Sequence, residues 1–432
     1  MSNKAYNTED DESITRDKTV NQWGISTYKR TFNSLRNPVF RLYYIGILGQ
    51  RASMNMEQLV RSLLIYRLTG SAALLGVLAL TSALPMLLFG FFGGAIADRF
   101  HKKYVLIVGM LSSAMVSLIV ALALTTGYMN PERTGSWWIL IVASGIQGSI
   151  MGLMIPSRQS IVREIVTGEQ LMNAVALDIL GMNAFRFMAP AISGFLTDAF
   201  DFEAVYFVMT GLYVMSAAVI AFMPLTRAIV VHSTGALSDI REGIRYIRHE
   251  TTLLLILAFT LFVVILSMPY MFLMPIFADD ILGVGATGMG VLLSVSGVGA
   301  IVGSLILASM PNKKRGLMLL SGSVVLGLAL IGFSFSNIWY ISLVLIAFVG
   351  VGQAFRMTLA STLLQYYVDD TYRGRVMSIY VMEHGLSSLG TFFAGLLAEV
   401  IGVQWTVGGF AIFLVVLSIS ALIFVPRVRK LE

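Results

Sequence analysis

The 432-residue chain contains no cysteine, which excludes disulfide bonds, thiolate metal sites and cysteine nucleophiles. Its four histidines are far apart in sequence and lack the spacing of metal ligands. No stretch matches the phosphate-binding pattern G-x-x-x-x-G-K-[ST], so the chain carries no sign of nucleotide hydrolysis. We therefore expect no bound metal and no cofactor.

Charged residues are also scarce, at 12% of the chain, whereas 56% of the residues are hydrophobic. A soluble protein of this length could not bury that much apolar surface. The apolar residues form blocks of about twenty, the length of helix that crosses a bilayer. The net charge of +6 is spread between these blocks rather than gathered in a patch, which excludes nucleic acid as a partner.

The hydrophobic pattern predicts an all-α membrane protein with twelve transmembrane helices. The expected spans are 41–66, 72–97, 104–127, 137–157, 173–197, 203–225, 253–277, 286–310, 316–336, 338–366, 376–399 and 403–425.

Lysine and arginine predict the orientation of these spans, because basic residues concentrate in cytoplasmic links. With the N-terminus inside, most of the 30 basic residues fall in inside segments, while the outside links hold only Arg67 and Arg133. This split predicts a multi-pass protein of the cell membrane with both termini in the cytoplasm.

Matching landmarks in the two halves of the chain indicate an internal duplication. Gly76-Val77-Leu78 corresponds to Gly290-Val291-Leu292, and two glutamines stand twelve residues apart in spans four and ten alike. Parallel repeats of this kind are a transporter architecture, with a site between the halves. The predicted organisation is a polar cytoplasmic tail (1–37), an N-terminal six-helix bundle (38–225), a linker with an amphipathic helix (226–252), a C-terminal bundle (253–425) and a short cytoplasmic tail (426–432).

Charged residues inside spans are costly unless they face a polar cavity or a partner, so each is a candidate for function. Span one is the most polar, and Glu57 and Arg61 stand four residues apart on one face of it. A purely structural pairing between helices is the alternative for every such residue. The predicted cavity and substrate-binding residues are Arg51, Asn55, Glu57, Gln58, Arg61, Asn183, Arg186, Tyr270, Gln353 and Arg356.

Titratable groups in the spans are candidates for proton coupling, because burial shifts the pKa of a carboxyl group and histidine titrates near neutrality. These candidates are Glu57, Asp178, Glu383 and His384. Glu383 could instead simply pair with Arg356 or Arg51.

Three stretches carry a resemblance to known proteins: "LTGSAALLGVLALTSALPMLLFGFFGGAIADRF", "MNAVALDILGMNAFRFMAPAISGF" and "YRGRVMSIY". They are similar to the major facilitator superfamily, and within it to the branch of enterobactin exporters and macrolide efflux proteins. The stretch "GGAIADRFHKK" is similar to the superfamily signature between spans two and three, and "MAPAISG" resembles the antiporter motif of span five. The arginine that proton-coupled exporters often carry in span four is absent from "SGIQG".

The resemblance implies roles for both motifs. The first implies a conformational latch on the cytoplasmic side, made by Gly94, Asp98, Arg99, Lys102 and Lys103. The second implies close helix packing by Ala189, Pro190, Ser193 and Gly194, because small residues let helices approach.

The expected function is that of a secondary transporter that exports an amphipathic small molecule, drug-like or siderophore-like, by alternating access and proton antiport. The four arginines within spans hint at an anionic or zwitterionic substrate. The alternative is a transporter of lysolipids or similar amphiphiles without strict proton coupling. An intramembrane enzyme would need a catalytic dyad, and none is evident, so no catalytic residues are expected. The expected partners are the substrate, protons and the lipid bilayer, and the expected state is a monomer.

Overall fold

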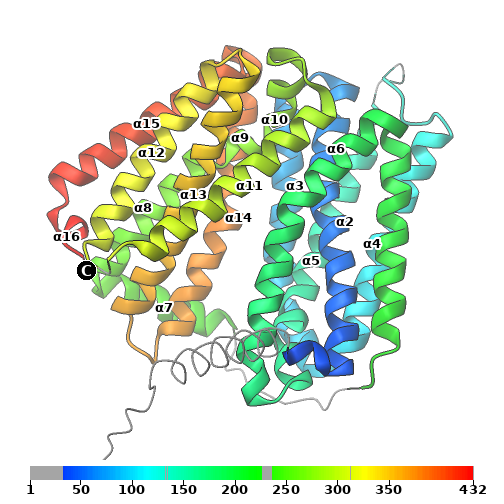
Figure 1. Cartoon of the computed structure of the whole chain (residues 1–432), viewed down its shortest axis with the longest axis horizontal. Coiled ribbons are helices and arrows are strands. Elements are labelled where there is room, and N and C mark those ends of the chain that lie inside the picture. The colour runs from blue at the N-terminus through cyan, green and yellow to red at the C-terminus, as the bar shows by residue number, and fades with distance from the viewer. Residues whose placement is uncertain (1–32, 132, 134, 226–235, 312, 432) are drawn as a thin grey trace, which may run out of the picture.

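The structure, a computed structural model, describes residues 33–131, 133, 135–225, 236–311 and 313–431 (Figure 1). Within these ranges every regular element is a helix, and ten helices are long and apolar enough to cross a membrane. Most of the predicted 1–37 tail and the first part of the 226–252 linker lie outside the described residues. The all-helical membrane fold predicted from the sequence is therefore correct.

Two helices reconcile these ten with the twelve predicted crossings. Helix α6 (Gly168–Ala221) has 54 residues and is divided by Asp201, whose φ of 64° and ψ of 172° are not helical. Its length, about 80 Å at 1.5 Å per residue, is enough for two crossings. Helix α2 (Pro38–Thr69) has 32 residues, and its charged and polar side chains set it apart from the ten. With α2 and both parts of α6, the described residues hold all twelve crossings.

The N-terminal half contains η1 (Asn33–Arg36), α2, α3 (Ala72–Arg99), α4 (Lys102–Thr125), α5 (Trp138–Ile165) and α6. Helix α2 begins where the sequence dictates: the Asn37 side chain accepts a hydrogen bond from the Val39 N–H at 2.9 Å, and Pro38 occupies the first turn. It ends at Gly70, whose left-handed backbone (φ 65°) favours glycine.

The C-terminal half contains α8 (Thr251–Ser267), α9 (Pro269–Phe272), α10 (Met274–Ile276), η2 (Phe277–Ile281), α11 (Gly285–Ser309), α12 (Arg315–Phe335), α13 (Trp339–Tyr367), α14 (Arg373–Ile401), α15 (Val403–Phe424) and α16 (Pro426–Arg429). Span seven was predicted over 253–277, and a stretch apolar and long enough to cross a membrane lies there, at Thr251–Phe272, but its helix is not continuous. The helix breaks after Ser267 because Pro269 and Pro275 each lack the N–H that a continuous helix needs.

Span four was also predicted to end too early, at residue 157. Helix α5 continues through Pro156 to Ile165, so Arg158 lies within the helix rather than in a link. A proline in a transmembrane helix is tolerated where neighbouring helices satisfy the freed backbone groups. Beyond Pro156, the Tyr43 hydroxyl donates a hydrogen bond to the Arg158 carbonyl oxygen at 3.2 Å and joins this part of α5 to α2.

The described part of the linker contains α7 (Ala236–His249), which packs against the C-terminal half. Its buried face presents Gly243 and Ile247, while its arginines are exposed. Tyr246 stacks on Tyr372 with ring centroids 4.2 Å apart, and Arg375 pairs with Glu242 at 3.0 Å. The linker helix is thus attached to one half of the molecule.

The two halves meet mainly through two helix pairs, α3 with α14 and α6 with α11. Figure 1 shows the bundles close together at the end that holds α10 and further apart toward α7. Glycines make both crossings tight: a Cβ on Gly290 of α11 would lie 2.4 Å from the Pro190 carbonyl oxygen, and one on Gly395 of α14 would lie 2.7 Å from that of Ala72. The "MAPAISG" motif of α6 therefore lies at an interface between the halves.

Replacing Gly290 by alanine should destabilise the protein, because the added methyl group meets backbone that cannot retreat. We expect a loss of about 1–3 kcal/mol in the free energy of unfolding, measured by SDS titration of the micelle-bound protein. Gly211→Ala is the matched control, since nothing lies within 4 Å of its added Cβ. It should be neutral or slightly stabilising. Equal losses in the two variants would contradict the close crossing.

Candidate functional site

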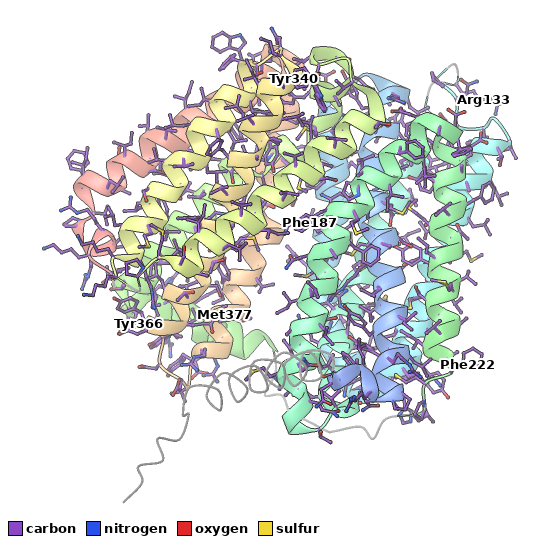
Figure 2. All side chains as sticks on the ribbon, viewed as in Figure 1. Arg133, Phe187, Phe222, Tyr340, Tyr366 and Met377 are labelled. Atoms are coloured by element: carbon purple, nitrogen blue, oxygen red, sulfur yellow. The ribbon has the colours of Figure 1, made fainter. Side chains whose placement is uncertain are left out.

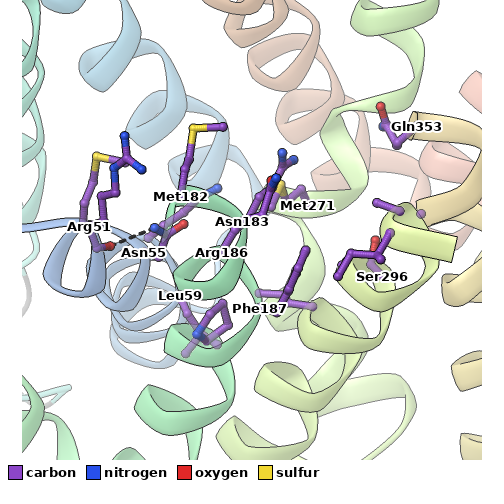
Figure 3. Close-up of a pocket in the computed structure, with 18 of the residues that line it drawn as sticks. Arg51, Asn55, Leu59, Met182, Asn183, Arg186, Phe187, Met271, Ser296 and Gln353 are labelled. Carbon is purple, nitrogen blue, oxygen red and sulfur yellow. Dashed lines mark hydrogen bonds between the residues drawn. The ribbon is translucent and has the colours of Figure 1, made fainter. Parts of the chain in front are cut away.

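A cavity of about 650 Å³ lies between the two halves (Figure 3). Helices α2, α5 and α6 line it from the N-terminal half, and the broken segment after α8, α11 and α13 line it from the C-terminal half. Phe187 of α6, labelled in Figure 2, reaches across to α11. Gly297 leaves room for it, because a Cβ there would lie 1.7 Å from the ring.

Most of the residues predicted to line a cavity do so. They are Arg51, Asn55, Gln58, Asn183, Arg186, Tyr270 and Gln353. Figure 3 shows those of α2 and α6 on one side of the cavity, and Ser296 and Gln353 on the other. Contact of these residues with a substrate stays a prediction.

Arg51 is held by an acid from a different helix. Its guanidinium lies 2.7 Å from Asp178 Oδ2 of α6 and also donates to the Asp178 carbonyl oxygen. Only 3% of the Arg51 surface is exposed, so the Asp178 carboxylate stabilises a positive charge that water no longer solvates. The pair also ties α2 to the first part of α6. Asp178, predicted as a candidate for proton coupling, serves here as a counter-ion.

Glu57 and Arg61 do not line the cavity. They pair with each other at 2.9 Å, as their spacing indicates, but the shared face of α2 turns into the N-terminal bundle. There the Tyr213 hydroxyl donates to Glu57 at 3.3 Å, and Arg61 donates to Ser82 at 3.4 Å. The cavity role predicted for both is corrected, because α3 and the second part of α6 cover this face and the sequence gives no sign of that.

Arg356 was also predicted to line the cavity, but it lies behind the residues that do so. It is fully buried, and two of its nitrogens donate to Gln353 Oε1 at 3.1 and 3.2 Å. Gln353 itself lines the cavity and so separates Arg356 from it. This places the buried guanidinium one side chain away from any ligand.

Glu383 lies in the same buried region, in α14, with 3% of its surface exposed. Thr260 of α8 donates a hydrogen bond to Glu383 Oε1 at 2.9 Å, whereas Oε2 has no hydrogen-bond partner among the described residues. Arg356 Nη1 likewise lacks a partner there. Nothing is described of the side chain of the adjacent His384.

The basic link after α3 binds within the N-terminal half. Lys102 pairs with the buried Glu164 of α5, and Lys103 donates to carbonyl oxygens at the end of α6. Arg99 is exposed, Gly94 has open space beside it, and the Asp98 side chain lies outside what the structure describes. The contacts of the two lysines explain the basic pair structurally, and the cross-half latch stays a prediction for another conformation.

The halves are fastened at the end opposite α7 by two carboxylates that cap helices across the interface. Asp198 of α6 accepts hydrogen bonds from the N–H groups of Ala286 and Thr287 at 3.3 and 2.7 Å, at the start of α11. Glu399 of α14 accepts from the Ala73 N–H at 3.0 Å, at the start of α3. A carboxylate at a helix N-terminus is favoured by the exposed N–H groups and the helix dipole.

The two caps repeat each other. Each joins the fifth span of one half to the second span of the other, as the internal duplication requires. Beside them, Arg67 of α2 forms a two-pronged ion pair with Asp279 at 2.8 and 3.1 Å, and Tyr66 donates to Asp280. We call Asp198, Glu399 and the Arg67–Asp279 pair the distal clamp.

The cavity lies between the distal clamp and the end that carries α7. Along α11 its lining runs from Leu293 to Leu305, four residues before the helix ends at Ser309. The clamp closes the opposite end, where α11 begins. The structure is therefore closed at one end and hollow toward the other.

A single family model matches residues 29–432, and its description is "Transmembrane secretion effector". The chain belongs to this family, MFS_3. The predicted resemblance to the major facilitator superfamily is thereby confirmed, and the chain is a multi-pass membrane transporter rather than an enzyme.

Curated relatives of this MFS_3 protein include transporters of different substrates. It is 24% identical to the staphyloferrin A transporter of Staphylococcus aureus over 340 residues, 78% of this chain and 83% of the relative. It is 22% identical to macrolide efflux protein A of Streptococcus pyogenes over 376 residues, 84% and 90% of the two chains. The MFS-type transporter YfiS of Bacillus subtilis is 26% identical over 392 residues, 86% and 90%.

Solved structures share the fold of the MFS_3 protein. The nucleoside transporter NupG superposes with a TM-score of 0.70 at 13% identity, covering 88% of this chain and 98% of that one. A bacterial homologue of the human lysosomal transporter Spinster, in an inward-facing and unoccupied conformation, gives a TM-score of 0.72 at 13% identity, covering 91% and 97%. At this identity the similarity shows the fold alone.

Removing both caps of the distal clamp should open that end of the protein. Each cap contributes about 1 kcal/mol, so Asp198→Ala with Glu399→Ala should raise the open population roughly tenfold to thirtyfold. Because the chain lacks cysteine, a single Leu59→Cys in the cavity wall can report this. Its labelling by an impermeant maleimide, added from the clamp side, should accelerate accordingly.

Glu203→Ala is the control for this measurement, since Glu203 lies beside the same bend of α6 at Asp201 but caps no helix among the described residues. It should leave the labelling rate unchanged. An unchanged rate in the double variant would show that the caps do not hold this end closed.

Proposed function

We propose that this protein exports an amphipathic small molecule across the cell membrane by alternating access, with proton antiport as the driving force. One observation carries the proposal: a cavity between two repeated bundles, hollow toward α7 and closed by the distal clamp. Rocking the bundles about the α3–α14 and α6–α11 crossings would expose the cavity to the other side. The relatives' printed names, staphyloferrin A transport and macrolide efflux, support a small-molecule substrate.

The orientation of the protein follows from its basic residues. Arginines cluster at the α7 end, with Arg241, Arg245 and Arg248 exposed on α7 itself. By the positive-inside rule this end is cytoplasmic, as are both termini. The structure then represents the state in which an exporter takes up its substrate from the cytoplasm or the inner leaflet.

Glu383 is the strongest of the four candidates for proton coupling. Asp178 and Glu57 are each paired with an arginine at hydrogen-bond distance. Glu383 has one carboxylate oxygen without a partner in the part of the chain that the structure describes, and it lies in the region of Arg356, which the cavity residue Gln353 contacts. A proton on Glu383 can therefore alter the position of Arg356, and through Gln353 the shape of the cavity.

A transporter of lysolipid-like molecules remains the second candidate, and apolar residues of the cavity favour it. Leu180 of α6 and Leu305 of α11 both line the cavity and are 58% and 65% exposed. Such a wall suits an acyl chain as well as a drug. Lipid flipping in proteoliposomes without any gradient would favour this candidate over the exporter.

Transport should depend on the proton gradient. Inverted membrane vesicles that contain the protein should take up substrate when acidified inside, and an uncoupler should abolish the uptake. A panel of fluorescent amphiphiles can serve as substrates, with vesicles that lack the protein as the control. Uptake that is indifferent to the uncoupler would rule out antiport.

Glu383→Gln should separate binding from coupling, because the amide keeps the Thr260 hydrogen bond but cannot exchange a proton. We expect at least a tenfold loss of gradient-driven uptake, with substrate exchange at equal pH retained. The pH dependence of uptake should flatten as well. Glu57→Gln, which breaks an ion pair inside the bundle, should instead lower the melting temperature while the remaining uptake stays pH-dependent. Unaltered coupling in Glu383→Gln would refute the assignment.

A further inference from the structure

The charges around the cavity are all of one sign. Three arginines line it, Arg51, Arg158 and Arg186, and no aspartate or glutamate does so among the described residues. Arg51 is neutralised by Asp178, which approaches it from α6. Arg158 and Arg186 have no such partner, since no described carboxylate pairs with either one. Two positive charges are thus left uncompensated in a largely apolar hollow.

Arg158 lies beside the Arg51–Asp178 pair, within electrostatic range of both residues and of Tyr43. The group therefore holds two guanidinium ions and only one carboxylate. Arg158 is half-buried, so water compensates its charge only in part. A second carboxylate, brought by a ligand, would complete the group, because a guanidinium binds a carboxylate with two parallel hydrogen bonds. The sequence did not reveal this residue, since span four was expected to end before it.

Arg186 stands further along the same wall. Eight residues of α6 separate it from Asp178, about 12 Å of helix rise. It lies within electrostatic range of Tyr270 and of the buried Arg356 across the cavity. It is exposed toward the cavity that it lines. The facing half offers it a tyrosine and another positive charge, and no described acid.

The opposite wall has a different character. Apart from Tyr270, Ser296, Ser304 and Gln353, the C-terminal half contributes only apolar side chains and glycine to the lining, and no charged residue. Met268, Met271 and Phe272 come from the segment that Pro269 breaks open. Methionine and phenylalanine make an adaptable apolar surface. The cavity therefore has a cationic N-terminal wall and an apolar C-terminal wall.

We infer that the cavity selects amphipathic organic anions, with the acid group attracted to the cationic wall by the charges of Arg158 and Arg186 and the apolar body on the C-terminal wall. This inference rests on the proposed function, because it takes the cavity as the substrate site. A lipophilic cation would meet uncompensated positive charge and would find no carboxylate among the described lining residues. Charge complementarity of this kind gives discrimination between ligands of equal size.

Three probes of matched size test the inference: pyrenebutanoate, pyrenebutanol and pyrenebutyl-trimethylammonium. Their binding to the purified full-length protein in phosphatidylcholine nanodiscs is measured by fluorescence anisotropy, with empty nanodiscs as background. The anion should bind at least tenfold more tightly than the cation. Arg158→Gln and Arg186→Gln should each raise the Kd of the anion about tenfold, leave that of the alcohol unchanged and lower that of the cation.

Matched variants separate charge from folding. Arg158→Lys and Arg186→Lys keep the charge and should recover most of the anion affinity. Arg163→Gln removes an exposed arginine from the same helix as Arg158, outside the cavity, and should change none of the three Kd values. Met271→Ala should weaken all three probes to a similar degree, because it removes apolar contact without changing charge.

The outcomes distinguish this inference from the proposed function. If the probes discriminate by charge but vesicles show no gradient-driven uptake, the transport proposal fails and the anion site stands. If uptake depends on the gradient but the anion and the cation bind equally, the anion site is refuted. Equal effects of the arginine variants on all three probes would also refute it.

Discussion

A charge held away from water must find an opposite charge or a set of hydrogen-bond donors, and this constraint organises the whole molecule. Within the N-terminal half it is met by ion pairs: Arg51 with Asp178, Glu57 with Arg61, and Lys102 with Glu164. The first ties α2 to α6 and the last ties α4 to α5, so both help to hold the bundle together. The charged residues that the sequence shows within spans thus include several that stabilise the N-terminal half rather than face a ligand.

Between the halves the same constraint is met in a reversible way. Asp198 and Glu399 satisfy their charge on the N–H groups that begin a helix of the other half. Because these carboxylates are exposed, water can replace their hydrogen bonds to the helix N-termini at a small cost in free energy. An ion pair buried in the bundle has no such replacement. Two equivalent caps related by the internal duplication give an interface that closes and opens as a whole. Glycines at the α3–α14 and α6–α11 crossings keep the backbones close enough to pivot.

In the cavity the constraint is left unmet among the described residues. Arg158 and Arg186 lack a counter-ion, and their wall faces an apolar one. An arginine without a counter-ion in such a position favours the binding of a ligand of opposite charge. On the C-terminal side Gln353 connects the cavity to Arg356, which lies within electrostatic range of Glu383. In the proposed mechanism, substrate selection and proton coupling lie in different halves, which the Gln353 side chain connects.

The sequence by itself determined the all-helical membrane fold, because hydrophobic runs of bilayer length and segregated basic residues are local signals. It also indicated the polar face of α2 and the tight "MAPAISG" crossing. It missed the break in span seven and placed the end of span four too early. Both errors involve proline, whose effect on a helix depends on the hydrogen-bond partners that neighbouring helices supply. Only the tertiary structure decided which charges pair and which remain free. Asp178 and Glu57 look alike in the sequence, but packing gives the first to Arg51 at the cavity and the second to the interior of the bundle. Arg158 gained its importance in the same way, since the absence of a partner is a property of three-dimensional neighbours and not of the residue.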